Sequence, residues 1–194
     1  GGDSGGAKTH VHLLLSNLSK TIDITMVCFM DGEFAREAME KGIRTIIIPG
    51  NNIPRTLSSL KKLVRDEHFD IIHCHGSRGN LMGALLKGST HLPVVTTVHS
   101  DYKLDYMGRP LAAATYGTLN LWALHCIRYR VAVSDTMRDQ LVARGFDYNT
   151  TFTIYNGIDF DRQEAPCDSA AFYSRIGADI RPGDVVVGAA ARLD

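Results

Sequence analysis

Short apolar runs alternate with amphipathic segments along most of the chain. The runs lie at residues 23–29, 43–48, 71–74, 94–98, 130–133 and 152–155, and each predicts a strand. Between them, apolar residues recur every third or fourth position, which predicts helices. Because the strands are apolar throughout instead of alternating, we expect each to be buried on both faces. The pattern therefore predicts an α/β fold, a Rossmann-like parallel sheet with helices on both faces.

Small residues mark the expected ends of several helices. Ser134 precedes a helix predicted at 137–144 and is expected to cap its N-terminus. Three glycines follow predicted helices and are expected to end them: Gly42, Gly88 and Gly145.

The chain changes in character after residue 160. A connector, a short helix at 168–176, a turn at 181–184 and a new strand at 185–191 are expected there. We therefore predict a first domain at 1–165, and at 166–194 a linker with the first strand of a second domain. The chain is expected to be truncated at both ends, because no strand precedes the first glycines and the last strand is incomplete.

A glycine-rich turn opens the chain and leads into a helix with one apolar face. Gly5 and Gly6 lie at the N-terminus of that helix, where free N–H groups and the helix dipole favour a phosphate, carboxylate or sugar hydroxyl. One alternative is a P-loop over residues 2–9 with Lys8 in the lysine position, although Ala7 replaces its second glycine. Another is a flexible glycine-rich terminus.

Polar residues directly follow the predicted strands. In an open parallel sheet, ligands bind beyond the carboxyl ends of the strands, so these residues are expected to converge on one edge. His99 is the predicted catalytic residue, because an imidazole there can donate to a sugar hydroxyl or act as an acid or base. The predicted substrate-binding and donor-binding residues on this edge are Gly5, Gly6, His75, Ser100, Asp101, Ser134 and Asn156.

Three neighbouring side chains have competing interpretations. His73 and His75 are expected on opposite faces of their strand, so they would not chelate a metal together, and no metal site is predicted. Arg78 either binds an anion or is a solvated surface charge.

Composition narrows the class of protein. Lys and Arg together number 21, as do Asp and Glu, so the net charge is zero and a broad nucleic-acid surface is not expected. The four cysteines form no C-x-x-C pair, and no signal peptide is expected, so a reducing cytoplasm is the expected location. The apolar stretch 111–127 contains several polar residues and predicts a buried helix, with an interfacial helix at the inner face of a membrane as the alternative.

Five segments, in this order, resemble the N-terminal half of group 1 (family 4) glycosyltransferases. They are the opening glycine turn, Phe69–His75, Val94–His99, Val131–Asp135 and Thr153–Asp159. The closing run Val187–Leu193 resembles the first strand of that family's second domain, with Ala191 where a glycine is usual. The resemblance covers nearly the whole chain.

The resemblance implies a GT-B fold, in which two Rossmann-like domains face each other and the second holds most of the nucleotide-sugar donor. It implies a retaining transferase with no cofactor and no metal in its active site. Gly5 and Gly6 would approach the donor diphosphate or the acceptor, His99 would contact the transferred sugar, and Arg192 would neutralise the leaving diphosphate.

The predicted function is therefore hexosyl transfer from a nucleotide sugar to a glycan, lipid or small-molecule acceptor. The chain is taken as an acceptor-side domain that is inactive without its C-terminal partner domain. Two alternatives remain: a P-loop-like nucleotide hydrolase, and a non-catalytic GT-B-like binding domain.

Overall fold

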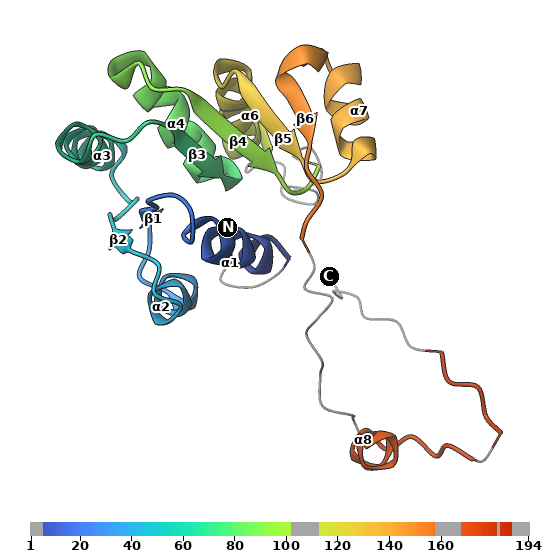
Figure 1. Ribbon diagram of the computed structural model, residues 1–194. Coiled ribbons are helices and arrows are strands. Elements are labelled where there is room, and N and C mark those ends of the chain that lie inside the picture. Colours follow the sequence, from blue (N-terminus) through green and yellow to red (C-terminus); the bar gives the residue numbers. More distant parts are fainter. Residues whose placement is uncertain (1–5, 102–112, 158–167, 182, 188–194) are drawn as a thin grey trace. The chain divides into compact units, whose positions relative to one another are not determined.

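Strands and helices alternate regularly in the described part of the chain. The computed structural model describes residues 6–101, 113–157, 168–181 and 183–187, and the chain divides into two units, residues 1–157 and 158–194. The first unit contains α1 (Gly6–Leu18), β1 (Met26–Cys28), α2 (Glu33–Glu40), β2 (Thr45–Ile47), α3 (Ile53–Glu67), β3 (Ile72–His75), α4 (Gly76–Thr90), β4 (Val94–Val98), the π-helical turn η1 (Ala113–Gly117), α6 (Thr118–Cys126), β5 (Tyr129–Ala132), α7 (Asp135–Ala143), η2 (Tyr148–Thr150) and β6 (Thr151–Thr153). The predicted α/β fold is confirmed (Figure 1).

All of the strand pairs are parallel, as predicted, but the described strands form two sheets. Strands β3, β4, β5 and β6 pair in that order, and β1 pairs with β2 in a separate two-stranded sheet. Apolar runs indicate that strands are buried but not which strands are neighbours, so the sequence pattern did not predict this division.

One face of the four-stranded sheet carries the main core. Cys74 and Val94 pack with Ala84 of α4 and with Ala123 and Ile127 at α6. Next to them, a second cluster joins α6 and α7 to the sheet through Val98, Leu124, Ala132, Leu141 and Phe146. This face is closed by helices.

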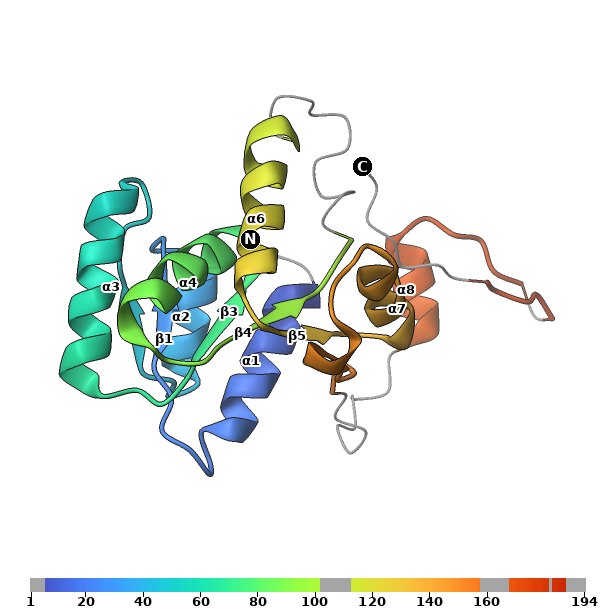
Figure 2. The same ribbon diagram turned by 90° about the horizontal axis from the view of Figure 1, so that it is seen from above.

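The opposite face is only partly covered. Helix α1 lies on this side, across the sheet from α4 and α6 (Figures 1 and 2). His73 and Phe152 remain exposed, so the expectation that every strand is buried on both faces was wrong for this sheet. Residues of β3 to β5 on this face are half-buried at positions such as Val95 and Val131. This open face is where polar side chains can meet a ligand.

Helix α1 is anchored to α2. The Lys8 ammonium lies 2.8 Å from Glu37 Oε1 and 3.3 Å from Glu33 Oε2. His12 is buried, donates from Nε2 to the carbonyl oxygen of Phe34 at 3.1 Å and stacks on the Phe34 ring. These contacts fix the helix beside the two-stranded sheet.

The helix ends follow the predicted caps with one exception. Gly42 and Gly145 have positive φ angles of 75° and 92° just after α2 and α7, and the Ser134 side chain accepts a hydrogen bond from the Met137 N–H. Helix α4 runs past Gly88 to Thr90 and is capped by His91, whose φ is 56°. The prediction for Gly88 was wrong because glycine permits a helix to end but does not force it.

The described part of the second unit contains a short helix followed by a turn. Helix α8 (Ser169–Arg175) is capped by Asp168, whose carboxylate accepts from the N–H groups of Ala170 and Ala171. The predicted turn is present, since the N–H of Asp184 donates to the carbonyl of Arg181. Residues 185–187 form no strand, contrary to the prediction, and residues 188–191 lie outside the described residues. A strand requires a hydrogen-bonded neighbour, and none pairs with 185–187 within the described part.

Candidate functional site

Parallel pairing brings the ends of β3 to β6 to one edge. His75 is the last residue of β3, and His99 directly follows β4. Ser134 lies two residues after β5, and Asn156 lies three residues after β6. The predicted convergence of these residues on the carboxyl edge is consistent with the register of the sheet.

His75 and His99 form the centre of this edge. The Nδ1 atom of His75 is 3.0 Å from the Nε2 atom of His99, and their rings are stacked with centroids 5.3 Å apart. His10 of α1 meets the His99 ring edge-on at a centroid distance of 5.1 Å and lies 6.3 Å from the His75 ring. Three imidazoles from three different elements are therefore gathered at one place.

The position of His73 corrects the sequence prediction. Its ring is 4.3 Å from that of His75, and its Nε2 atom is 2.8 Å from the Thr97 hydroxyl. His73 and His75 are two residues apart on β3, and side chains with that spacing point to the same face of a strand. The expectation of opposite faces was therefore wrong.

The histidines are held in a weakly solvated environment that favours their neutral forms. Burial is the main cause that lowers the pKa of His99 to about 4, and repulsion from positive charge on His10 and His73 is the smaller cause. Desolvation also lowers the pKa of His73 to about 4, although part of that residue is exposed, and it lowers the pKa values of His75 and His10. At neutral pH the rings can therefore exchange hydrogen bonds but carry no charge.

A metal centre is not built from these rings. Among the described residues, no group of three or more His, Cys, Asp or Glu side chains has an arrangement that could hold a metal ion. The nitrogens of His75 and His99 that face each other are used in their mutual hydrogen bond. The cluster is therefore suited to hydrogen bonding with a polar ligand.

The first residue of α1, Gly6, lies on the same side of the sheet as the histidine pair. Gly6 is the first residue of α1, and His10, one turn later, contacts the His99 ring. Gly6 is exposed, and a Cβ added to it would meet no atom within 4 Å. Binding of an anion or a sugar hydroxyl at this helix N-terminus stays a prediction. Gly5 lies outside the described residues.

Asp101 and Ser134 already have protein partners. The Asp101 carboxylate accepts two hydrogen bonds of 2.6 Å from Arg144, which closes α7, and this pair fastens the segment after β4. Ser134 uses its hydroxyl as the α7 cap. Ser100 is exposed. A role for any of them in ligand binding stays a prediction.

The last strand adds a contact that the sequence did not suggest. Asn156 is exposed, and just before it the Tyr155 hydroxyl donates to Asp135 Oδ2 at 2.5 Å. This hydrogen bond lowers the pKa of Asp135 and raises that of Tyr155. His10 and Tyr155 were not among the residues that the sequence predicted for this edge. The one signal for His10 was its spacing of four residues from Gly6, which places both on one side of the helix.

Of the three basic residues considered, one is committed to ion pairs within the protein. Lys8 is bound by Glu33 and Glu37, so its charge is neutralised within the protein and gives no support to the P-loop alternative. Arg78 is exposed and packs over Gly50, where an added Cβ would be 3.1 Å from Arg78 Cδ, and both interpretations of this residue stay predictions. Arg192 lies outside the described residues.

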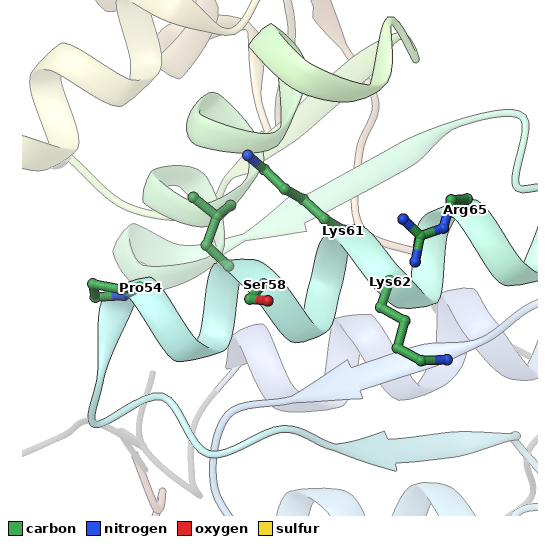
Figure 3. Close-up of a pocket in the computed structure, with 6 residues that line it drawn as sticks. Pro54, Ser58, Lys61, Lys62 and Arg65 are labelled. Carbon is green, nitrogen blue, oxygen red and sulfur yellow. The ribbon is translucent and has the colours of Figure 1, made fainter.

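A surface groove on α3 does not coincide with the histidine cluster. It has a volume of about 550 Å³ and is lined by Pro54, Leu57, Ser58, Lys61, Lys62 and Arg65 (Figure 3). These residues all belong to one helix and include none of the strand-end residues. The groove therefore contributes nothing to the site at the sheet edge.

The chain was compared with known proteins. It is 24% identical over 153 residues to the UDP-Gal:alpha-D-GlcNAc-diphosphoundecaprenol alpha-1,3-galactosyltransferase of Escherichia coli, covering 74% of this chain and 39% of that protein. The structure of Anabaena HepE in complex with UDP-glucose matches with a TM-score of 0.73 and 16% identity, over 91% of this chain and 48% of HepE. The chain thus spans less than half the length of either.

The same architecture also occurs in a putative UDP-N-acetylglucosamine 2-epimerase from Listeria monocytogenes, with a TM-score of 0.58, 13% identity, and coverage of 76% of this chain and 42% of that one. Fold similarity alone therefore does not select a reaction. The model of the family described as Glycosyltransferase Family 4 matches residues 4–162, which is most of the chain. The chain belongs to glycosyltransferase family 4.

Proposed function

We propose that the protein containing this chain transfers a hexosyl group from a nucleotide-diphosphate sugar to an acceptor, with retention of the anomeric configuration and without a cofactor or an active-site metal. Family membership and the histidine cluster at the carboxyl edge support the proposal together. The name of the Escherichia coli relative contains UDP-galactose, and HepE was solved with UDP-glucose. UDP-sugars are therefore the first donors to test.

In this proposal His99 donates a hydrogen bond to the transferred sugar. A neutral imidazole can donate from one nitrogen while accepting at the other, and the low pKa of His99 keeps the ring in that form at neutral pH. The exposed N-terminus of α1 at Gly6 offers N–H groups to the donor diphosphate or to the acceptor. Arg192, with a further domain, would stabilise the departing diphosphate.

The acceptor is proposed to be a glycan, a lipid or a small molecule, reached with peripheral membrane contact. Tyr116, Leu119 and Trp122 are 61%, 43% and 45% exposed, and their spacing of three places them along one side of η1 and α6. Residues 113–126 contain no Asp, Glu, Lys or Arg. An exposed stripe with Trp and Tyr suits the boundary between water and lipid. Within the described residues, no helix has the length and apolar character needed to span a bilayer.

The test is to incubate the full-length protein with UDP-, GDP- and ADP-sugars and measure release of nucleoside diphosphate. We expect release with one donor class. In His99→Ala we expect the rate of release to fall about 10- to 100-fold, the range for losing one or two hydrogen bonds made in the transition state. His68→Asn is the matched control, because His68 is an exposed histidine at φ 53°, a conformation that Asn tolerates.

Three outcomes would contradict parts of the proposal. No release with any nucleotide sugar would favour a non-catalytic binding domain. An inverted anomeric signal in the proton NMR spectrum of the product would exclude retention. A submicromolar Kd for a nucleotide sugar, measured by calorimetry on the 194-residue chain, would show that donor binding needs no second domain.

A further inference from the structure

The contact between His75 and His99 constrains where protons lie. Two imidazole nitrogens 3.0 Å apart form a hydrogen bond only when one carries a hydrogen and the other does not. In a neutral ring, the state of one nitrogen decides the state of the other. The bond at Nε2 of His99 therefore determines whether the free Nδ1 atom of that ring is a donor or an acceptor.

The surroundings strengthen this constraint. His75 ends β3 and His99 follows β4, so both rings are attached to paired strands of one sheet. Besides burial, positive charge on His10 of α1 or on His73 of β3 lowers the pKa of both rings, and charge on His99 lowers that of His75. His73 has its own partner, the Thr97 hydroxyl at 2.8 Å, and His10 packs edge-on against His99. Among the described contacts, His99 therefore has one hydrogen-bond partner for its ring, His75 at Nε2.

We propose that His75 is a positioning residue that holds His99 in a single tautomer and ring orientation, so that the Nδ1 atom of His99 meets the sugar in one fixed hydrogen-bonding state. His75 acts through His99 and need not touch the substrate. The catalytic part of this inference rests on the proposed transferase function. The tautomer itself is a property of the chain and can be measured without any activity.

The first experiment is NMR of the ¹⁵N-labelled 194-residue chain at neutral pH, reading the two ring nitrogens of His99 through their long-range couplings to ring protons. We expect one tautomer in the wild type. In His75→Phe, which keeps a flat ring but has no ring nitrogen, we expect a mixture of the two tautomers. His75→Asn places a polar atom near the position of Nδ1 and is expected to restore a single tautomer.

His73→Phe is the matched control. It removes an imidazole from the same strand and the same face but leaves the His75 to His99 contact in place, so the His99 tautomer should not change. A mixture of His99 tautomers in the wild type would overturn the proposal directly, even if a variant failed to fold. An unchanged single tautomer in His75→Phe would overturn it as well.

The second experiment uses the full-length protein and the donor found active. We expect kcat to fall about tenfold in His75→Phe with a small change in KM, the effect of losing one orienting hydrogen bond, and to recover in His75→Asn. Full kcat in His75→Phe would overturn the positioning role. If no nucleotide sugar reacts but the tautomer shifts as expected, the function proposal fails while the positioning of His99 stands.

Discussion

At the scale of single residues, the sequence placed His99 and His75 on the same edge but did not predict that His10 contacts them. A histidine directly after an apolar strand is predicted to face a ligand site, because parallel strands place their carboxyl ends together. The contact with His10 depends on where α1 crosses the sheet, and no local pattern specifies that. The His73 prediction failed for a different reason, since the two-residue repeat of a strand was applied incorrectly. Cys74 is a core residue, and burial raises the pKa of its thiol to about 12.

The lowered histidine pKa values predict how stability depends on pH. His10, His73, His75 and His99 have folded-state pKa values below the ordinary 6.5, so the unfolded chain binds more protons between about pH 4 and 6.5. The free energy of unfolding should therefore decrease as the pH is lowered through this range. Urea denaturation of the chain at pH 7.5, 6.5, 5.5 and 4.5 measures it.

A histidine variant separates this effect from the carboxylates. The carboxyl groups of Glu37 and Glu67 have lowered pKa values, so their contribution is lost mainly below their ordinary pKa of 4.5. His75→Asn should make the decrease between pH 6.5 and 4.5 shallower. A urea midpoint that stays constant or rises on acidification would contradict the expected neutral cluster.

At the scale of elements, periodicity and caps predicted helices well but not their exact ends. Helix α4 shows why, because its glycines have different surroundings. A Cβ on Gly83 would lie 2.3 Å from Cys74 Sγ and 3.1 Å from Val94 Cγ1, whereas a Cβ on Gly88 would meet nothing within 4 Å. Gly83 therefore allows β3 and β4 to approach the helix. The sequence alone does not distinguish a glycine needed for packing from one that is merely tolerated.

Alanine substitutions at these two glycines should have opposite effects. Gly83→Ala should destabilise the chain by about 1–3 kcal/mol, because the core must move to admit the methyl group. Gly88→Ala should stabilise it by about 0.5–1 kcal/mol, because alanine has the higher helix propensity and finds open space. Urea midpoints at pH 7.5 measure both. Equal effects at the two positions would mean that α4 does not pack closely on Cys74.

At the scale of the whole molecule, the α/β class was predictable and the division into two sheets was not. Long-range pairing decides which strands are neighbours, and nothing in an apolar run of a few residues encodes it. The run at 185–187 shows the same limit, since its valines predict a strand but 90% of Val185 and 91% of Val187 are exposed. A strand is a property of a sheet more than of a segment.

The exposed stripe on η1 and α6 gives a prediction for the molecule as a whole. Trp122 is the one tryptophan in the sequence, so intrinsic fluorescence reports on this surface directly. Mixing the chain with vesicles of zwitterionic and anionic phospholipid should shift the emission to shorter wavelength as the indole leaves water. Leu119→Ser should weaken vesicle binding, and Ile22→Ser, which changes an exposed apolar residue elsewhere, should not. An emission spectrum unaffected by vesicles would exclude membrane contact through this stripe.

Helix α1 connects two parts of the molecule that have no shared strand pairing among the described residues. Leu15 packs against the core of the two-stranded sheet, while His10 touches the ring of His99 on the other sheet. The position of His10 in the histidine cluster thus depends on contacts that α1 makes with the two-stranded sheet. Glu37 and Phe34 contact Lys8 and His12 of α1, so substituting either one is expected to move His10 relative to the His99 ring. The histidine cluster would then change through residues that are not part of it.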